Sequence, residues 1–452
     1  MRELTLVQLN DLHGYMEPHP EWVWSPDGFA YKRMGGLARI KTIVHQLRRD
    51  NPHLLFTDNG DTLHGTRTVV ESQGECLVPV LNHLGLSAMT GHWDFAYGPD
   101  HLQRLVGTLQ YPFLAANVYS CEDGRNIFPA VKCVDLGSIR VGIIGLACNI
   151  VDKVMPPHFS TGIRFTNGEE ELAQYVQQLR AREHCDVVVL LSHLGLPQDL
   201  ELVGRVPGVD VCLSGHTHNR VERPIRVGRT VVIQSGCHGS FLGTLRLHLG
   251  PEGVDLQEHR LIPVDEAIPE DSTIAALVQV AVAGSREVLQ KVVGRTAIDL
   301  NRATMLESTA DNLLLDAMRD ATGVELAFVN GWRYGVPIPQ GEVTLDQLYN
   351  LAPMDPEITT LELRGREVWD MLEENLERTF SRDPFGQMGG YVKRCGGMKT
   401  FFKAESPSGT RIQAISSATK VSSRSGSTEL HPSLCRRFRR SMARTGNPRA
   451  SM

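Results

Sequence analysis

Short runs of valine, isoleucine and leucine alternate with helical stretches through the first half of the chain, and this alternation restricts the fold most. Near-continuous apolar runs are typical of strands that are covered on both faces. Residues 35–48 place apolar side chains at helical spacing. We expect strands at these runs: 4–9, 53–57, 141–147, 186–191, 209–213, 231–234 and 242–249. The alternation predicts an α/β domain built in layers.

The later half has a different organisation. A polar stretch near residues 263–272 precedes an expected long helix over 273–293. Shorter helices are expected at 309–322, 345–350 and 365–379, with a strand at 326–329. These features predict four segments: a first domain at 1–265, a linker helix at 266–293, a second domain at 294–415 and a tail at 416–452.

The tail differs from the rest in composition. It holds eight basic residues against one acidic residue, is rich in serine and has no apolar periodicity. Such a segment cannot bury enough apolar surface to order itself, so disorder is expected. Two alternatives stay open, a basic arm for phosphate-bearing partners and an end translated out of frame.

Charge and cysteine usage exclude some classes of function. The formal net charge of −6 gives no reason to expect nucleic-acid binding. No run of eighteen apolar residues predicts a membrane span, and the first residues enter a strand rather than a signal segment. The nine cysteines are widely spaced and form no Cys-x-x-Cys pair. We therefore expect a cytoplasmic protein with reduced thiols in its core.

Four polar loops follow predicted strands. They are Asn10–Gly14, Asp58–Thr62, Ser192–Gly195 and Gly215–His218. Each alone has an ordinary structural explanation. Because ligands gather at the carboxyl ends of strands in open α/β sheets, the four loops together predict one site. Carboxylates combined with imidazoles suit Mn, Fe or Zn, and a carboxylate can bridge two ions.

The same loops carry a family resemblance. Asp11-x-His13, Gly60-Asp61, His193 and Gly215-His216-x-His218 resemble the calcineurin-like metallophosphoesterases. Further motifs narrow it to the two-domain 5'-nucleotidase and UDP-sugar hydrolase group. These are Met34–Arg39, Gly60–Thr66, Phe95–Gly98, Gln234–Gly236, Asp311–Leu313, Asp316–Arg319, Asn330-Gly331 with Arg333, and Leu363–Gly365. The resemblance covers roughly residues 4 to 415. It implies a layered β-sandwich flanked by helices, followed by a smaller α/β substrate domain.

The resemblance also implies a metal-ligand set. Asp11, His13, Asp61 and His218 would hold one divalent ion, and Asp61 would bridge to a second. His193 and His216 would hold that second ion. The site would hold two divalent metal ions, each of them Mn, Zn, Co or Fe. They would activate a water molecule for attack on phosphorus in line with the leaving group. A small nucleotide-type molecule would be the substrate.

One stretch departs from the family pattern of Gly-Asn-His-Glu/Asp followed by a later Asp. Here it reads Gly91-His92-Trp93-Asp94-Phe95-Ala96. In the favoured alignment His92 takes the ligand position, Trp93 the position of the catalytic histidine and Ala96 that of its aspartate. In the alternative, His92 is the catalytic histidine. We name His92 and Asp94 as catalytic candidates, with a general acid in doubt because an indole cannot shuttle a proton.

The Gly-His-Trp-acidic pattern also resembles the thiosulfohydrolases of sulfur oxidation, which cleave a cysteine S-thiosulfonate on a carrier protein. The absence of an export signal in this sequence and the Asn330-Gly331 pair count against that alternative. A third possibility is a catalytically weakened protein that binds metal and nucleotide. For the substrate, the resemblance suggests Arg333, Asn330 and Phe385 as contacts. Phe385 is equally well explained as a packed loop aromatic. His64 and His238 are each expected either near the site or in a surface loop.

Overall fold

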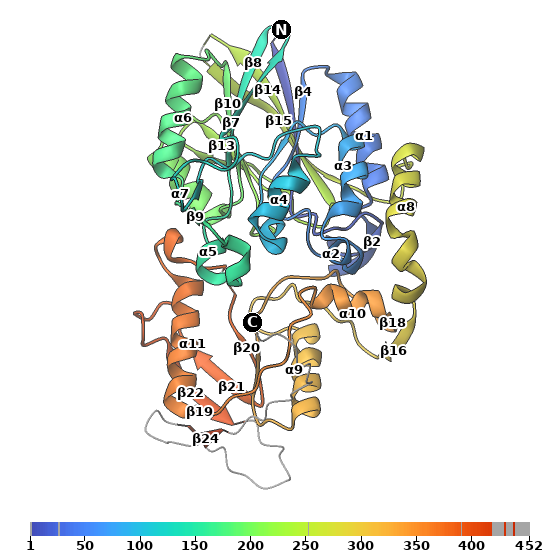
Figure 1. The fold of residues 1–452 in the computed structure, drawn as a ribbon, viewed down its shortest axis with the longest axis vertical. Coiled ribbons are helices and arrows are strands. Elements are labelled where there is room, and N and C mark those ends of the chain that lie inside the picture. Colours follow the sequence, from blue (N-terminus) through green and yellow to red (C-terminus); the bar gives the residue numbers. More distant parts are fainter. Residues whose placement is uncertain are drawn as a thin grey trace. The chain divides into compact units, whose positions relative to one another are not determined.

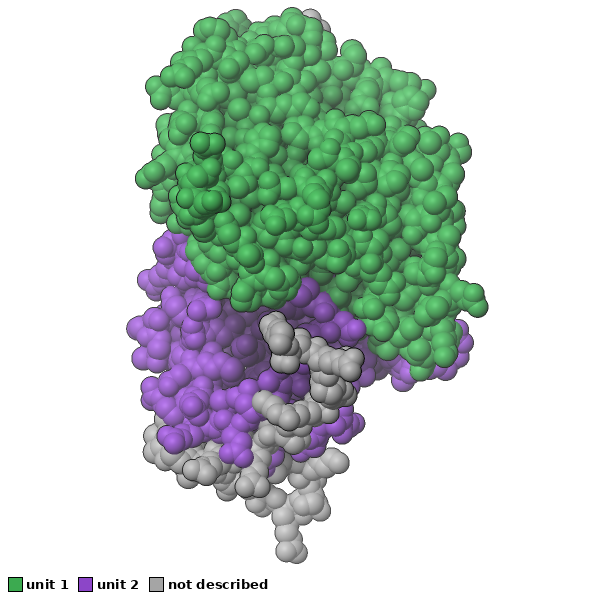
Figure 2. Space-filling model, viewed as in Figure 1, with its two compact units in different colours: residues 1–294, 343–353 green, residues 295–342, 354–452 purple. Residues whose placement is uncertain are grey.

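The computed structural model describes residues 2–25, 28–251, 253–389, 391–417, 429–430 and 437–438. The chain forms two compact units (Figure 2). The first unit holds Met1–Gly294 and Val343–Pro353, and the second holds Arg295–Glu342 and Met354–Met452. The return of the chain to the first unit at Val343–Pro353 was not indicated by the sequence. The chain passes between the units three times: within β16 (Val292–Thr296), within β18 (Gly341–Thr344) and after Pro353.

Two β-sheets form the centre of the first unit. One has the strand order β15-β14-β1-β4-β5 and the other β12-β13-β11-β10-β8-β7. The strands of the first sheet are β1 (Glu3–Leu9), β4 (Leu54–Asp58), β5 (Ala88–Met89), β14 (Phe241–Gly250) and β15 (Gly253–Pro263). Those of the second are β7 (Val131–Leu136), β8 (Ile139–Leu146), β10 (Val187–Ser192), β11 (Val211–Ser214), β12 (Ile225–Val227) and β13 (Thr230–Ile233).

Apolar side chains from both sheets share one core. Leu6 on β1 and Leu55 on β4 are buried in the same cluster as Val189 on β10 and Leu213 on β11. Helices α1 (Leu37–Asp50), α3 (Val78–Leu84), α6 (Glu169–Ala181) and α7 (Leu196–Arg205) flank the two sheets (Figure 1). The predicted layered sandwich with flanking helices is confirmed. Its basis is the one predicted from sequence, namely runs of Val, Ile and Leu that pack on both faces.

Parallel pairing brings the ends of the functional strands together. Strand β1 pairs in parallel with β4, and β10 pairs in parallel with β8 and β11. All the polar loops singled out by the sequence follow strands in these parallel sets. Since parallel strands end at the same edge of a sheet, their loops gather there.

The remaining elements of the first unit are mostly short. They are β2 (His19–Ser25), β3 (Gly28–Met34), α2 (Arg67–Glu71), η1 (Glu75–Leu77), η2 (Trp93–Tyr97), α4 (Pro99–Val106), β6 (Val118–Ser120), α5 (Val151–Val154), η3 (Pro157–Ser160), β9 (Ile163–Phe165), α8 (Ser272–Leu289) and α10 (Leu345–Leu351).

Helix α8 corrects one prediction. A single helix was expected over 273–293, but α8 ends at Leu289 and residues from Val292 form strand β16. The β-branched Val292 and Val293 favour extended backbone, which explains the early end. Among the described residues, α8 is the one helix whose length and hydropathy would allow it to cross a membrane. Its Ile274, Val278 and Val282 are buried within the protein.

The second unit is a smaller α/β structure. Its elements are α9 (Thr309–Thr322), β17 (Ala327–Val329), β19 (Leu363–Arg364), α11 (Gly365–Phe380), η4 (Pro384–Gly386), β20 (Arg394–Gly396), β21 (Met398–Phe402), β22 (Ile412–Ser417), β23 (Glu429–Leu430) and β24 (Arg437–Phe438). Val368 and Leu372 on α11 pack with Met398 on β21 and Ile412 on β22. Helix α9 has the predicted bounds, with Ser308 capping its first turn. Most of the predicted tail lies outside the described residues.

Candidate metal centre

The loops after β1, β4, β5, β10 and β11 converge on one cluster of histidines and aspartates. Two groups within it have ligand atoms that all lie within 4.8 Å of one another. One group is Asp11, His13, Asp61 and His218, and the other is Asp61, His92, His193 and His216. Asp61 belongs to both groups. The arrangement therefore has two places for a cation with one carboxylate between them.

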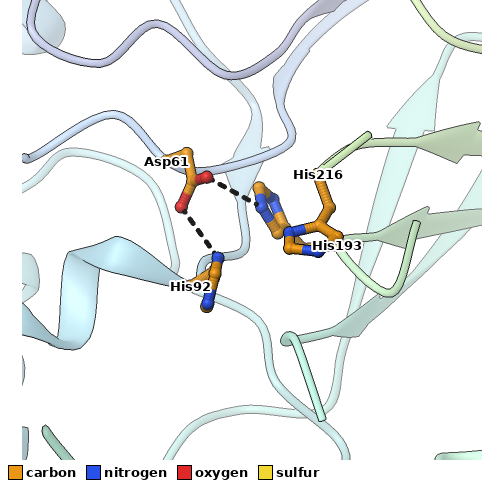
Figure 3. A group of neighbouring side chains, drawn as sticks. All are labelled: Asp61, His92, His193 and His216. Carbon is orange, nitrogen blue, oxygen red and sulfur yellow. Dashed lines mark ion pairs between the residues drawn. The ribbon is translucent and has the colours of Figure 1, made fainter. Parts of the chain in front are cut away.

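Figure 3 shows the second group, with one carboxylate and three imidazoles turned toward a common point. Oδ1 of Asp61 lies 3.5 Å from Nδ1 of His92, and Oδ2 lies 3.3 Å from Nε2 of His193. His92 comes from the segment after β5, where the sequence departs from the family pattern. The structure places it in a group of side chains that could hold a metal ion, and its role as a ligand stays a prediction.

Unpartnered buried nitrogens test whether this group fits a cation. Nδ1 of His193 lies 2.5 Å from the carbonyl oxygen of Asn59, which can only accept, so Nδ1 carries the ring hydrogen. Nε2 of His193, both ring nitrogens of His92 and Nδ1 of His216 are buried without a hydrogen-bond partner among the described residues. Buried polar atoms are normally paired. A divalent cation would supply the missing partner.

The first group has a similar geometry. Nε2 of His13 lies 3.1 Å from Nε2 of His218 and 3.6 Å from Oδ2 of Asp61. Nε2 of His218 lies 3.3 Å from Oδ1 of Asp11. The side-chain amide of Asn10 donates to Oδ2 of Asp11 at 2.7 Å, which fixes the orientation of that carboxylate. Two imidazoles and two carboxylates thus face a shared volume.

The protonation of the cluster follows from burial and charge. Burial raises the pKa of Asp61, but the neighbouring His193, His92 and His13 outweigh burial and hold that pKa well below its usual value. Burial lowers the pKa of His193, but Asp61 and Asp11 raise it to about 10. Burial, with His92 and His193 nearby, lowers the pKa of His216 well below normal. The metal-free cluster thus combines ionised carboxylates with a protonated His193, which must lose its proton before it can bind a metal ion.

The backbone at the cluster is strained. Five of its residues have positive φ, a region that non-glycine residues rarely adopt. They are Asp11 (52°), His13 (49°), Asp61 (53°), His216 (70°) and His218 (56°). Such strain persists where the surrounding structure requires it and is concentrated at functional sites.

Asp94 organises two of the loops. Its carboxylate is buried and accepts from the backbone N–H groups of Asp61, Thr62 and Leu63 at 2.9–3.0 Å, and from that of His92 at 3.1 Å. A Cβ atom at Gly60 would lie 2.5 Å from Cα of Gly91, so only glycine allows the two loops to approach this closely. Asp94 thereby joins the segment of the shared carboxylate to the segment of His92.

Trp93 is buried beside the cluster. Its backbone N–H donates to Oδ1 of Asp61 at 2.7 Å. Its indole stacks on the ring of His64, with centroids 4.9 Å apart and an interplanar angle of 20°. Burial lowers the pKa of His64 to about 3. A surface position, one of the two expectations for His64, is therefore wrong.

His238 is also buried, and the surface alternative is wrong for it too. Its ring lies 5.8 Å from the ring of His13 and 4.6 Å from that of Tyr15, and its backbone N–H donates to the carbonyl oxygen of Asp11. The sequence signal for this placement was the position of His238 after the predicted strand at 231–234. That signal was too weak to separate a buried neighbour from a loop residue.

The predicted substrate contacts lie in the second unit. Nε of Arg333 donates to the hydroxyl of Tyr391 at 2.6 Å, and its guanidinium lies 4.7 Å from the Tyr391 ring centroid. The side-chain oxygen of Asn330 lies 3.3 Å from Nζ of Lys393. Phe385 lies in η4, where its backbone N–H donates to Asp383.

Comparison with known proteins adds a family signal for both halves of the chain. The family model described as calcineurin-like phosphoesterase matches residues 4–220, and that described as 5'-nucleotidase, C-terminal domain, matches residues 284–430. A bovine (Bos taurus) 5'-nucleotidase is 25% identical over 91% of this chain and 77% of its own length. The trifunctional nucleotide phosphoesterase YfkN of Bacillus subtilis is 23% identical, and this chain spans 30% of its length.

Solved structures give the same picture. The sulfate thiohydrolase SoxB of Thermus thermophilus superposes with a TM-score of 0.87 at 26% identity, covering 96% of this chain and 88% of the other. A 5'-nucleotidase precursor from Thermus thermophilus superposes with a TM-score of 0.83 at 25% identity and the same coverage. Both neighbours share the complete two-part architecture.

Proposed function

Because this chain belongs to the two-domain family that joins a calcineurin-like phosphoesterase domain to a 5'-nucleotidase C-terminal domain, we propose that it hydrolyses a phosphate monoester or anhydride of a nucleotide. The observation that carries the proposal is the position of Asp61 in two adjacent groups of ligand atoms. A shared carboxylate between two cation positions is the arrangement used for in-line displacement at phosphorus.

The chain's own residues would hold the two ions. When bound, such ions lower the pKa of water and offset charge on phosphoryl oxygens. Asp61 would serve both positions. His193 would offer Nε2, because its Nδ1 donates to the carbonyl oxygen of Asn59, and Asn10 orients the carboxylate of Asp11. The donor sets favour Zn, Fe, Co or Mn over Ca, since Ca prefers oxygen ligands alone.

The segment 91–94 contributes in three ways. His92 completes the second group of ligands. Asp94 acts as a positioning residue rather than as a proton carrier, because its oxygens are occupied by backbone N–H groups. Trp93 replaces a proton donor, so substrates whose leaving group needs little protonation are preferred.

Arg333, Asn330 and Phe385 stay predicted contacts for the remainder of the substrate. Arg333 suits a carboxylate or phosphate, and the Phe385 ring suits a base. The nucleotide substrate rests on the family and on the names of the relatives. The cytoplasmic location stays a prediction of the sequence.

The experiment is a substrate screen with added Mn, Zn, Co or Fe. The panel holds nucleoside monophosphates, nucleotide sugars, cyclic nucleotides and diesters. The variants Asp61→Ala and His216→Ala should lose both metal content and hydrolysis, whereas His45→Ala, on the exposed side of α1, should retain both. The proposal would be disproved if the two site variants retained both their metal and metal-dependent hydrolysis. Saturable nucleotide binding without turnover would favour the weakened binding protein instead.

A second candidate is hydrolysis of a cysteine S-thiosulfonate. It is favoured by the superposition on the thiohydrolase SoxB and by the indole of Trp93 beside the cluster, since a sulfur leaving group needs little proton help. A peptide carrying a cysteine S-thiosulfonate, assayed beside a nucleoside monophosphate with the same metal, discriminates the two. Turnover of the peptide alone would replace the leading proposal.

A further inference from the structure

Two cysteines far apart in the sequence meet in the second sheet of the first unit. Sγ of Cys133, on β7, lies 3.9 Å from Sγ of Cys185, which lies two residues before the start of β10. Both are free thiols, and neither belongs to the metal centre. Cys185 is a buried core thiol, as expected, and Cys133 is half-buried.

The thiols meet because strand β8 carries no side chain between them. Cys133 is paired in register with Gly142 of β8. A Cβ atom at Gly142 would lie 3.0 Å from Sγ of Cys185. The missing side chain leaves a gap across the middle strand, and the two sulfur atoms approach through it. Their separation must close by about 2 Å to reach the S–S bond length, a shift that side-chain rotation can contribute to.

Opposing influences act on the Cys185 thiol. Nε of Arg140, on β8, is buried without a hydrogen-bond partner among the described residues. Burial and the neighbouring Cys133 thiol raise the pKa of Cys185 to about 12, while the charge of Arg140 opposes them. A guanidinium beside a thiol favours the thiolate, the reactive form, although this guanidinium also pairs with Asp135 and Glu183.

The two thiols differ in solvent exposure, and this difference assigns a role to each. Cys133 is half-buried, so a small molecule in solvent can reach it, whereas Cys185 is 5% exposed. Cys133 therefore suits the attacking role and Cys185 the resolving role. Thiol–disulfide exchange needs this combination of one accessible thiol and one nearby partner.

We propose that Cys133 and Cys185 form a reversible disulfide by exchange with a low-molecular-weight disulfide such as oxidised glutathione. The Cys133 thiolate attacks one sulfur of the small disulfide and expels the first small thiolate. Cys185 then loses its proton to solvent, attacks the Cys133 sulfur and expels the second. Two protein thiols are oxidised to one disulfide, and one small disulfide is reduced to two thiols.

The bond would fasten an edge strand. Among the strands that the structure describes, β7 pairs with β8 alone and lies at the edge of the sheet. The crosslink would attach it to the segment before β10 and close a loop between positions 52 residues apart. Because a crosslink restricts the unfolded chain, oxidation should raise the melting temperature. Strand β10 separates the pair from His193 by about 20 Å, so hydrolysis should be unaffected.

The test treats the full chain with oxidised glutathione in excess and maps its peptides without reduction. A peptide joining Cys133 to Cys185, and a melting temperature higher by on the order of 5 °C, are expected. Both should disappear on adding a reductant and be absent from Cys133→Ser and Cys185→Ser. The exposed Cys121→Ser is the matched control and should keep both.

Three outcomes would overturn the proposal. They are a lasting glutathione adduct on Cys133 without the crosslink, both thiols remaining reduced, and a crosslink from either cysteine to a different one. The peptide map of the unmodified sequence gives this answer even if a serine variant does not fold. Hydrolysis is measured separately, before and after oxidation. A protein that hydrolyses none of the substrates would contradict the proposed function but not the disulfide.

Discussion

The backbone N–H of Trp93 donates a 2.7 Å hydrogen bond to Oδ1 of Asp61, the carboxylate shared by the two ligand groups. The residue that departs from the family pattern thus contacts the centre of the site through its main chain. Such a contact survives any side-chain replacement except proline. The substitution of histidine by tryptophan can therefore remove a proton donor without disturbing the bridging carboxylate.

The first prediction concerns the leaving group. Because the Trp93 indole cannot protonate a departing oxygen, aryl phosphates with acidic phenols should be hydrolysed faster than alkyl phosphates by roughly 10²–10⁴-fold. The measurement is kcat/KM across a series of leaving groups. The double variant Trp93→His with Ala96→Asp should narrow the difference, and equal rates for both substrate types in the unmodified protein would show that another group supplies the proton.

The second prediction concerns metal choice. His92 gives its group three imidazoles and one carboxylate, a set that suits Zn better than Mn. His92→Asn exchanges a nitrogen donor for an oxygen donor and should weaken Zn binding at one of the two positions. We expect the affinity for Zn to fall by at least about 10–100-fold, because removing even a residue that supports a metal ligand typically costs that much. Competition with a chelator measures it.

The exposed His45→Asn on α1 is the control for that experiment and should bind Zn as the unmodified chain does. Unchanged affinity in His92→Asn would mean that His92 is not a ligand. The alternative alignment, in which His92 acts as the catalytic histidine, would then gain support, because kcat would fall while metal content stayed constant.

The third prediction concerns Asp94. Asp94→Asn places an amide group against backbone N–H donors and leaves at least one of them unsatisfied, at about 1–3 kcal/mol each. The melting temperature and the metal content should both fall. Asp100→Asn, on the exposed side of α4, is the matched control. A variant with full metal content but low kcat would instead favour a chemical role for Asp94.

The fourth prediction concerns pH. The pKa of His193 is raised to about 10 in the metal-free cluster, so below that pH the imidazole is protonated and must lose its proton to bind a cation. Affinity should therefore increase by about tenfold per pH unit between pH 7 and 9. Calorimetry in two buffers of different ionisation enthalpy should detect the released proton. A pH-independent affinity without proton release would contradict this protonation state.

The sequence could predict the ligand loops because each follows an apolar run, and such runs identify strands directly. Helix α9 was predicted to the residue because Ser308 and Gly323 mark its ends. The hairpin of β2 and β3 was missed, since its strands mix polar and aromatic residues and the buried positions of β2, His19 and Glu21, are polar. The contacts of Asp94 with four backbone N–H groups could not be predicted from the sequence, because they depend on how two loops fold against each other.

The positive φ angles at the ligand residues have an evolutionary meaning. Glycine would relieve the strain at Asp11, His13, Asp61, His216 and His218, so selection for folding alone would replace these side chains. Folding alone therefore does not explain why side chains that need this backbone conformation stand at all five positions.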